Sequence, residues 1–93
     1  MAIGFVLDTP GGTQEQYLEL LQALGVEPHG VPVNGQVFHA AGPYEGGWRV
    51  VDVWESRQAF DRFFHERLVS AIEAVGGPQP NPPQFFAVYN VEK

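Results

Sequence analysis

The order of strand and helix patterns is the feature that most constrains the fold of this chain. Residues 3–8 form a short apolar run that ends in the breaker sequence of residues 9–12, as a buried strand followed by a turn does. Thr13 and Gln16 then have the spacing of a helix capping box, and apolar residues recur at helical intervals as far as Gly25. The chain is therefore predicted to begin with a strand that leads into an amphipathic helix.

The rest of the chain adds a hairpin, a second helix and a last strand. Residues 37–42 and 48–54 have the composition of strands, and the turn-rich residues 43–47 between them predict a hairpin. Ser56 can cap the helix that follows, whose broad apolar stripe ends at a pair of glycines. Residues 84–91 are rich in β-forming residues and predict the final strand.

The order strand, helix, strand, strand, helix, strand is the split βαβ arrangement of ferredoxin-like domains. We therefore predict one α+β domain over residues 1–93, with a four-stranded antiparallel sheet. Right-handed crossovers send both helices to the same side, so they cover one face of the sheet and leave the other open. Residues 26–36, which carry prolines and glycines, are predicted to be a connecting loop.

The predicted strands are apolar on both of their faces. In residues 48–54, Val51 and Val53 lie on one side, and the other side carries Trp48, Val50 and Trp54. Residues 84–91 have a similar two-sided pattern. The chain is 44% hydrophobic and only 17% charged, so apolar surface is left over after two helices cover one face. We therefore predict that the open face meets the same face of a second copy, which gives a symmetric homodimer.

Charge and composition argue against several partners and cofactors. The net charge is −6 and the five Lys and Arg residues are scattered, so neither nucleic acid nor an anionic membrane surface is an expected partner. The chain has no Cys, and its three His residues lack a local ligand motif, so no metal is expected. With no recognisable signal peptide and no segment that could span a bilayer, the expected location is the cytoplasm.

The hairpin holds the candidate catalytic pair. If its turn is symmetric, His39 lies across from Asp52, whereas a slip by one residue would separate the two. Asp52 shares a strand face with Trp48 and Trp54, and we expect all four side chains on the face that the helices leave open. A carboxylate fixes the tautomer of a neighbouring His, which makes His39 a candidate general base in an aromatic-walled cavity. The alternative is a structural pair, with tryptophans that fill the core or the dimer interface.

Two further residues are candidates for substrate binding. His65 lies on the flank of the second helical stripe and could reach the mouth of a pocket. Tyr89, on the last strand, could donate a hydrogen bond to a ligand, as could Tyr17 and Asn90. For each of them, an ordinary position at the surface or at the boundary of the core is the competing interpretation.

The stretch GWRVVDVWES at residues 47–56, continued by Ala59, Phe60 and Phe63, resembles a known family. It is similar to the central strand and second helix of the dimeric α+β barrel superfamily, and in particular to the antibiotic biosynthesis monooxygenase-like domains. The similarity covers residues 36–75. The resemblance implies two ferredoxin-like subunits that face their sheets together, with a pocket in each subunit or near the dimer centre.

The candidate residues of the hairpin and the resemblance together lead to two hypotheses about function. The first is a cofactor-independent monooxygenase that acts on a small aromatic or polyketide-like compound, with His39 and Asp52 as catalytic residues. The second is a non-catalytic dimeric module that binds a small apolar ligand or serves as an accessory protein. Haem degradation is not expected, because Asp8, Phe63 and Glu73 depart from the Asn, Trp and His of the haem-degrading branch.

Overall fold

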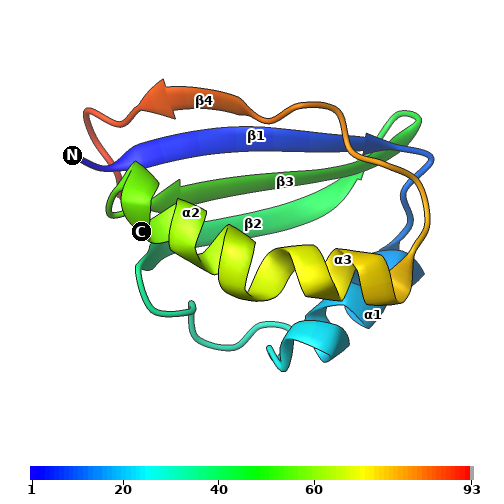
Figure 1. Cartoon of the computed structure of the whole chain (residues 1–93). Helices are drawn as coiled ribbons and strands as arrows, with labels where there is room; N and C mark the ends of the chain where they lie inside the picture. Colours follow the sequence, from blue (N-terminus) through cyan, green and yellow to red (C-terminus); the bar gives the residue numbers. More distant parts are fainter. Residues whose placement is uncertain (93) are drawn as a thin grey trace.

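The computed structural model describes residues 1–92, and within them four strands form one antiparallel sheet with helices on one of its faces (Figure 1). The second helix consists of three consecutive segments, α2, η1 and α3, of which η1 is a π-helical turn. The elements in chain order are β1 (Ile3–Pro10), α1 (Gln14–Leu24), β2 (Gln36–Tyr44), β3 (Gly47–Trp54), α2 (Arg57–Phe63), η1 (Phe64–Leu68), α3 (Val69–Val75) and β4 (Gln84–Ala87).

The strand order is β2-β3-β1-β4, with β1 and β3 in the centre and all pairs antiparallel. This order and the helices on one face confirm the predicted ferredoxin-like α+β fold. Thr13 caps α1 through a complete capping box with Gln16, and the side chain of Ser56 caps α2, as their spacing predicts. None of the helices in residues 1–92 has the length and apolar character that crossing a bilayer requires.

The last strand is shorter than predicted. β4 ends at Ala87, which pairs with Ile3, the first residue of β1. Beyond this pair, one more backbone hydrogen bond joins the Val88 N–H to the carbonyl of Ala2, the residue before β1. Strand structure needs a paired backbone, so the β-forming residues after Val88 remain outside the sheet.

The aromatic core lies between the sheet and the second helix. Phe5, Trp54 and Phe60 are its buried members, and Trp54 is fully buried. The Trp54 ring contacts the Phe60 ring edge-on at 5.6 Å between centroids, and the Phe63 ring at 5.2 Å. The strand face that carries Trp54 therefore faces the helices.

This placement corrects one prediction. His39, Asp52, Trp48 and Trp54 were expected on the open face of the sheet, but that strand face packs under the helices. Both faces are apolar, and the tryptophan face offers the larger area to the phenylalanine stripe of the second helix, so burying it stabilises the fold more.

The open face of the sheet retains apolar side chains. Strand alternation puts Val51 and Val53 there, and Phe86 from β4 lies on the same face. The Phe86 ring lies directly over Gly4, so close that a Cβ atom on that glycine would lie 2.5 Å from the ring. Phe86 itself is half exposed. At the other end of β1, Asp8 accepts two hydrogen bonds from Arg49, at 2.6 and 2.8 Å.

Candidate functional site

The hairpin of β2 and β3 has the predicted register. Tyr44 pairs with Gly47, which leaves a two-residue turn whose second residue, Gly46, has a φ of 100°. His39 consequently lies opposite Asp52, and its Nδ1 is 2.6 Å from Asp52 Oδ1. The β-bulge of β2 lies before His39 and does not disturb this pairing.

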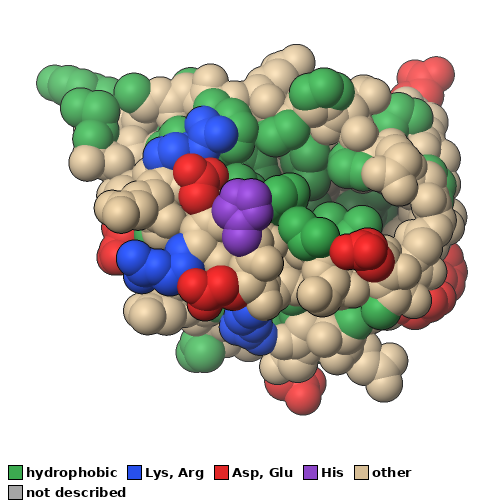
Figure 2. Space-filling model, in the orientation of Figure 1, with side chains coloured by type: hydrophobic (Ala, Val, Ile, Leu, Met, Phe, Trp, Pro, Cys, Tyr) green, Lys and Arg blue, Asp and Glu red, His purple; other side chains and the backbone are tan. Residues whose placement is uncertain are grey.

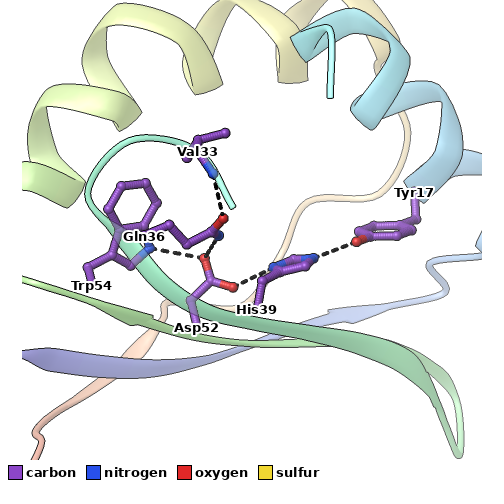
Figure 3. A network of polar contacts seen from close by, with 6 residues as sticks. All are labelled: Tyr17, Val33, Gln36, His39, Asp52 and Trp54. Carbon is purple, nitrogen blue, oxygen red and sulfur yellow. Dashed lines mark hydrogen bonds and ion pairs between the residues drawn. The ribbon is translucent and has the colours of Figure 1, made fainter. Parts of the chain in front are cut away.

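Asp52 is a buried carboxylate, 5% exposed, that is surrounded by donors (Figure 3). Its Oδ2 accepts hydrogen bonds from Gln36 Nε2 and from Trp54 Nε1, each at 3.0 Å, while Oδ1 faces His39. The Gln36 amide is itself fixed, because its Oε1 accepts the Val33 N–H at 3.2 Å. All three side chains around Asp52 present N–H groups, which suits an acceptor-only carboxylate.

Tyr17 extends this network from α1. Its hydroxyl lies 2.5 Å from His39 Nε2, and its ring is nearly parallel to the imidazole (Figure 3). The Tyr17 ring also contacts the Trp48 ring, at 5.2 Å between centroids. Burial raises the pKa of the Tyr17 hydroxyl, and the nearby negative charge of Asp52 raises the pKa further, so the hydroxyl retains its proton.

The donor pattern defines the tautomer of His39. Because Asp52 Oδ1 accepts, His39 Nδ1 carries a hydrogen, and the neutral ring has its lone pair at Nε2. Nε2 therefore accepts the hydrogen bond that the Tyr17 hydroxyl donates. We call this continuous chain of hydrogen bonds the Tyr17–His39–Asp52 triad.

An apolar cavity of about 120 Å³ lies beside the triad, between the sheet and the helices. Figure 2 shows it as a hollow surrounded by hydrophobic side chains between α3 and the sheet. Tyr17 and Trp48 form part of its wall, whereas His39 and Asp52 do not line it. Much of the remaining lining is aliphatic: Leu7, Leu20, Val50, Leu68, Ile72 and Val75.

The structure places the six predicted site residues in four different settings. His39 and Asp52 contact each other, and Trp48 lines the cavity. Trp54 is in the core, where its indole N–H holds Asp52. His65 is exposed on η1, with the Phe64 ring beside it, and Tyr89 is fully exposed beyond β4; neither lines the cavity.

Two members of the network were not assigned a site role from the sequence. Tyr17 was recognised only as one of several possible donors, and its rotation on α1 toward His39 depends on how the helix packs. Gln36 precedes the predicted strand, and the bulge that aligns it with Trp54 has no signal in the sequence. Within residues 1–92, no cluster of three His, Asp or Glu side chains could hold a metal ion.

A four-stranded sheet in this order, with helices on one face and a cavity beneath them, defines a ferredoxin-like α+β protein. No protein-family model and no curated protein matches the sequence. Among solved structures, the chain is similar to a mutant of SnoaB from Streptomyces nogalater, a protein described as a cofactor-independent oxygenase. The TM-score is 0.64 over 97% of this chain and 95% of that chain, with 15% sequence identity. The comparison confirms the fold that the resemblance to antibiotic biosynthesis monooxygenase-like domains implies.

Proposed function

We propose that the protein is a cofactor-independent monooxygenase for a small aromatic compound, with His39 as the base and Asp52 as the carboxylate that orients it. The observation that carries the proposal is the hydrogen-bonded pair of these residues beside an apolar cavity. The likeness to SnoaB, described as a cofactor-independent oxygenase, supports the proposal through the shared fold.

The reaction needs a base, a bound substrate and dioxygen. A proton leaves the methylene group of an anthrone-type substrate for His39, and Asp52 stabilises the resulting imidazolium. The electron-rich carbanion transfers electrons to dioxygen and forms a carbon–oxygen bond, which after protonation gives a hydroperoxide. Loss of water converts the hydroperoxide into a carbonyl, so one oxygen atom enters the product and the other leaves as water.

The cavity matches the apolar part of such a substrate. Its volume of about 120 Å³ is close to that of cavities that bind a single benzene ring. A fused-ring substrate would insert one ring between the aliphatic lining and the aromatic wall of Tyr17 and Trp48, and its other rings would extend toward the opening. Fixed orientation of the ring beside the base supplies part of the rate enhancement.

We also propose that the open sheet face binds a second copy of the chain. The apolar side chains of this face, among them the half-exposed Phe86, would be buried in a symmetric interface. Light scattering at micromolar concentration should give the mass of a dimer, and Phe86→Glu should shift it to the monomer. The control is Val31→Glu, because Val31 is 85% exposed in the loop before β2. A wild-type monomer would contradict the proposal.

Oxygen uptake with anthrone or 1,8-dihydroxyanthrone tests the enzymatic proposal. The amount of oxygen consumed above the uncatalysed background should equal the amount of quinone formed. His39→Gln should lower the rate of oxygen uptake about 10²–10⁴-fold. The matched control is His29→Asn in the exposed loop, where the φ of 62° suits Asn and the rate should not change. No uptake, or uptake that His39→Gln leaves unchanged, would favour the non-catalytic binding module.

A further inference from the structure

Both nitrogen atoms of His39 are already occupied. Nδ1 is 2.6 Å from Asp52 Oδ1, and Nε2 is 2.5 Å from the Tyr17 hydroxyl. A neutral imidazole has one donor and one acceptor, so no hydrogen-bonding position remains on this ring for a substrate. His39 also does not line the cavity, whereas Tyr17 does, so Tyr17 is the member of the triad next to a molecule held there.

Tyr17 lies between the cavity and His39. Its side chain forms part of the cavity wall, and its hydroxyl hydrogen points to His39. A phenol oxygen that donates its hydrogen keeps two lone pairs, so the Tyr17 oxygen can still accept a hydrogen bond from a molecule in the cavity. A tyrosine hydroxyl is protonated at neutral pH, as a proton relay requires, and burial raises the pKa of Tyr17 further above that range.

On the basis of the proposed function, we infer that Tyr17 is the catalytic residue that contacts the substrate and relays its proton to His39. The acidic hydrogen of the substrate moves to the Tyr17 oxygen while the Tyr17 hydrogen moves to His39 Nε2. Tyr17 ends as it began, His39 becomes an imidazolium beside Asp52, and the substrate becomes an enolate or carbanion. The step is reversible and uses no oxidant.

The far end of the relay reaches solvent. The His39 side chain is 31% exposed, whereas the Asp52 side chain is only 7% exposed. A proton that arrives on His39 can therefore exchange with water, and the return path delivers a solvent proton to the substrate. The protein should consequently catalyse exchange of an acidic C–H hydrogen with solvent in the absence of dioxygen.

Anaerobic hydrogen–deuterium exchange tests this inference. The wild-type protein in D₂O should accelerate loss of the anthrone methylene signal in proton NMR spectra. Tyr17→Phe, which removes only the hydroxyl, should lower the exchange rate at least about 100-fold, while the Kd for anthrone, followed by tryptophan fluorescence, stays within about threefold. The matched control is Tyr44→Phe, because Tyr44 is the last residue of β2 and does not line the cavity, and its exchange rate should equal that of the wild type.

A second measurement addresses the hydroxyl without deleting it. Replacement of Tyr17 by 3-fluorotyrosine makes the phenol more acidic, so a relay through it should shift the pH profile of exchange toward lower pH. A merely structural Tyr17 would leave that profile unchanged. The circular dichroism spectrum and urea midpoint of each variant establish that it is folded.

The outcomes separate the relay from the oxygenase proposal. Exchange without oxygen uptake would retain the relay and contradict the oxygenase proposal. Oxygen uptake without exchange, or Tyr17→Phe exchanging within threefold of the wild-type rate, would overturn the relay and leave His39 as a base that acts directly. The absence of both activities would overturn both proposals.

Discussion

Replacement of Asp52 by Asn should separate the orientation of His39 from the packing around it. The amide has the shape of the carboxylate but only one acceptor oxygen. We expect this oxygen to face Trp54 and Gln36, which both donate a hydrogen bond on that side. The Trp54 N–H is fully buried, so it has no access to water and needs this acceptor. The amide NH₂ group must then face His39 Nδ1.

A donor at this position inverts the imidazole. His39 would present its lone pair at Nδ1 and carry its hydrogen at Nε2, where it would donate to the Tyr17 oxygen instead of accepting from the Tyr17 hydroxyl. A base held in the wrong tautomer cannot take the proton that the relay delivers. We expect the exchange and oxygen-uptake rates to fall about 10²–10⁴-fold, the loss typical of removing a positioned base.

The stability cost of Asp52→Asn should be small by comparison. Three charge-assisted hydrogen bonds become neutral ones, which loses about 1 kcal/mol each. Part of this loss is offset because the variant no longer buries a charge. We expect the free energy of unfolding to fall by about 1–2 kcal/mol for Asp52→Asn. For Asp52→Ala, which leaves the buried Trp54 N–H without an acceptor, the fall should be about 3 kcal/mol or more.

Urea unfolding, the two activity assays and nitrogen-15 NMR of the imidazole provide the measurements. The NMR spectrum should show hydrogen on Nδ1 of His39 in the wild type and on Nε2 in Asp52→Asn. The control is Asp61→Asn, an exposed carboxylate paired with Arg57, which should change stability by about 0–1 kcal/mol and leave activity unaffected. An Asp52→Asn variant that keeps hydrogen on Nδ1, or retains activity within tenfold, would refute the tautomer argument.

Two further predictions concern the hairpin and the phenol. Gly47→Ala would place a Cβ atom 2.2 Å from a backbone carbonyl oxygen of β1 and should cost about 1–3 kcal/mol in urea unfolding, whereas Gly42→Ala, with no atom within 4 Å, should have little effect. In ultraviolet titration, Tyr17 should ionise above its usual pKa of 10.0, and Asp52→Asn should move that pKa back toward 10.0. Because the folded state holds this proton more tightly, the contribution of Tyr17 to stability is complete below pH 10.0 and is lost as pH rises through the folded pKa.

Local rules explain why so much of the fold was predictable. The capping residues, the turn glycines and the alternation of apolar residues act over a few positions, and they correctly predicted the helix starts, the hairpin and the pairing of His39 with Asp52. The end of β4 depends instead on where β1 begins, far away in the sequence. The π-helical turn η1 likewise has no signal in the spacing of the apolar stripe.

The orientation of the site could not be read from one strand. Valines on one face and tryptophans on the other give β3 two apolar faces, and strand alternation alone cannot distinguish which one the helices cover. The choice depends on the aromatic stripe of the second helix, where Phe60 and Phe63 pack on Trp54. This choice also brings Tyr17 of α1 to His39, so the same packing that was mispredicted creates the triad.

The buried Asp52 is itself an argument for a functional site. A carboxylate in the core is expensive to desolvate, and well-packed apolar residues in place of buried charges are often as stabilising or more so. This carboxylate has no Lys or Arg among its hydrogen-bonding partners in residues 1–92, and it depends on donors from Gln36, His39 and Trp54. One of these donors, His39, extends the chain of hydrogen bonds to the Tyr17 hydroxyl at the cavity. An apolar residue at position 52 would leave the buried Trp54 N–H without an acceptor and could not orient His39, so the carboxylate both completes the local hydrogen bonding and supplies the partner that the proposed proton transfer requires.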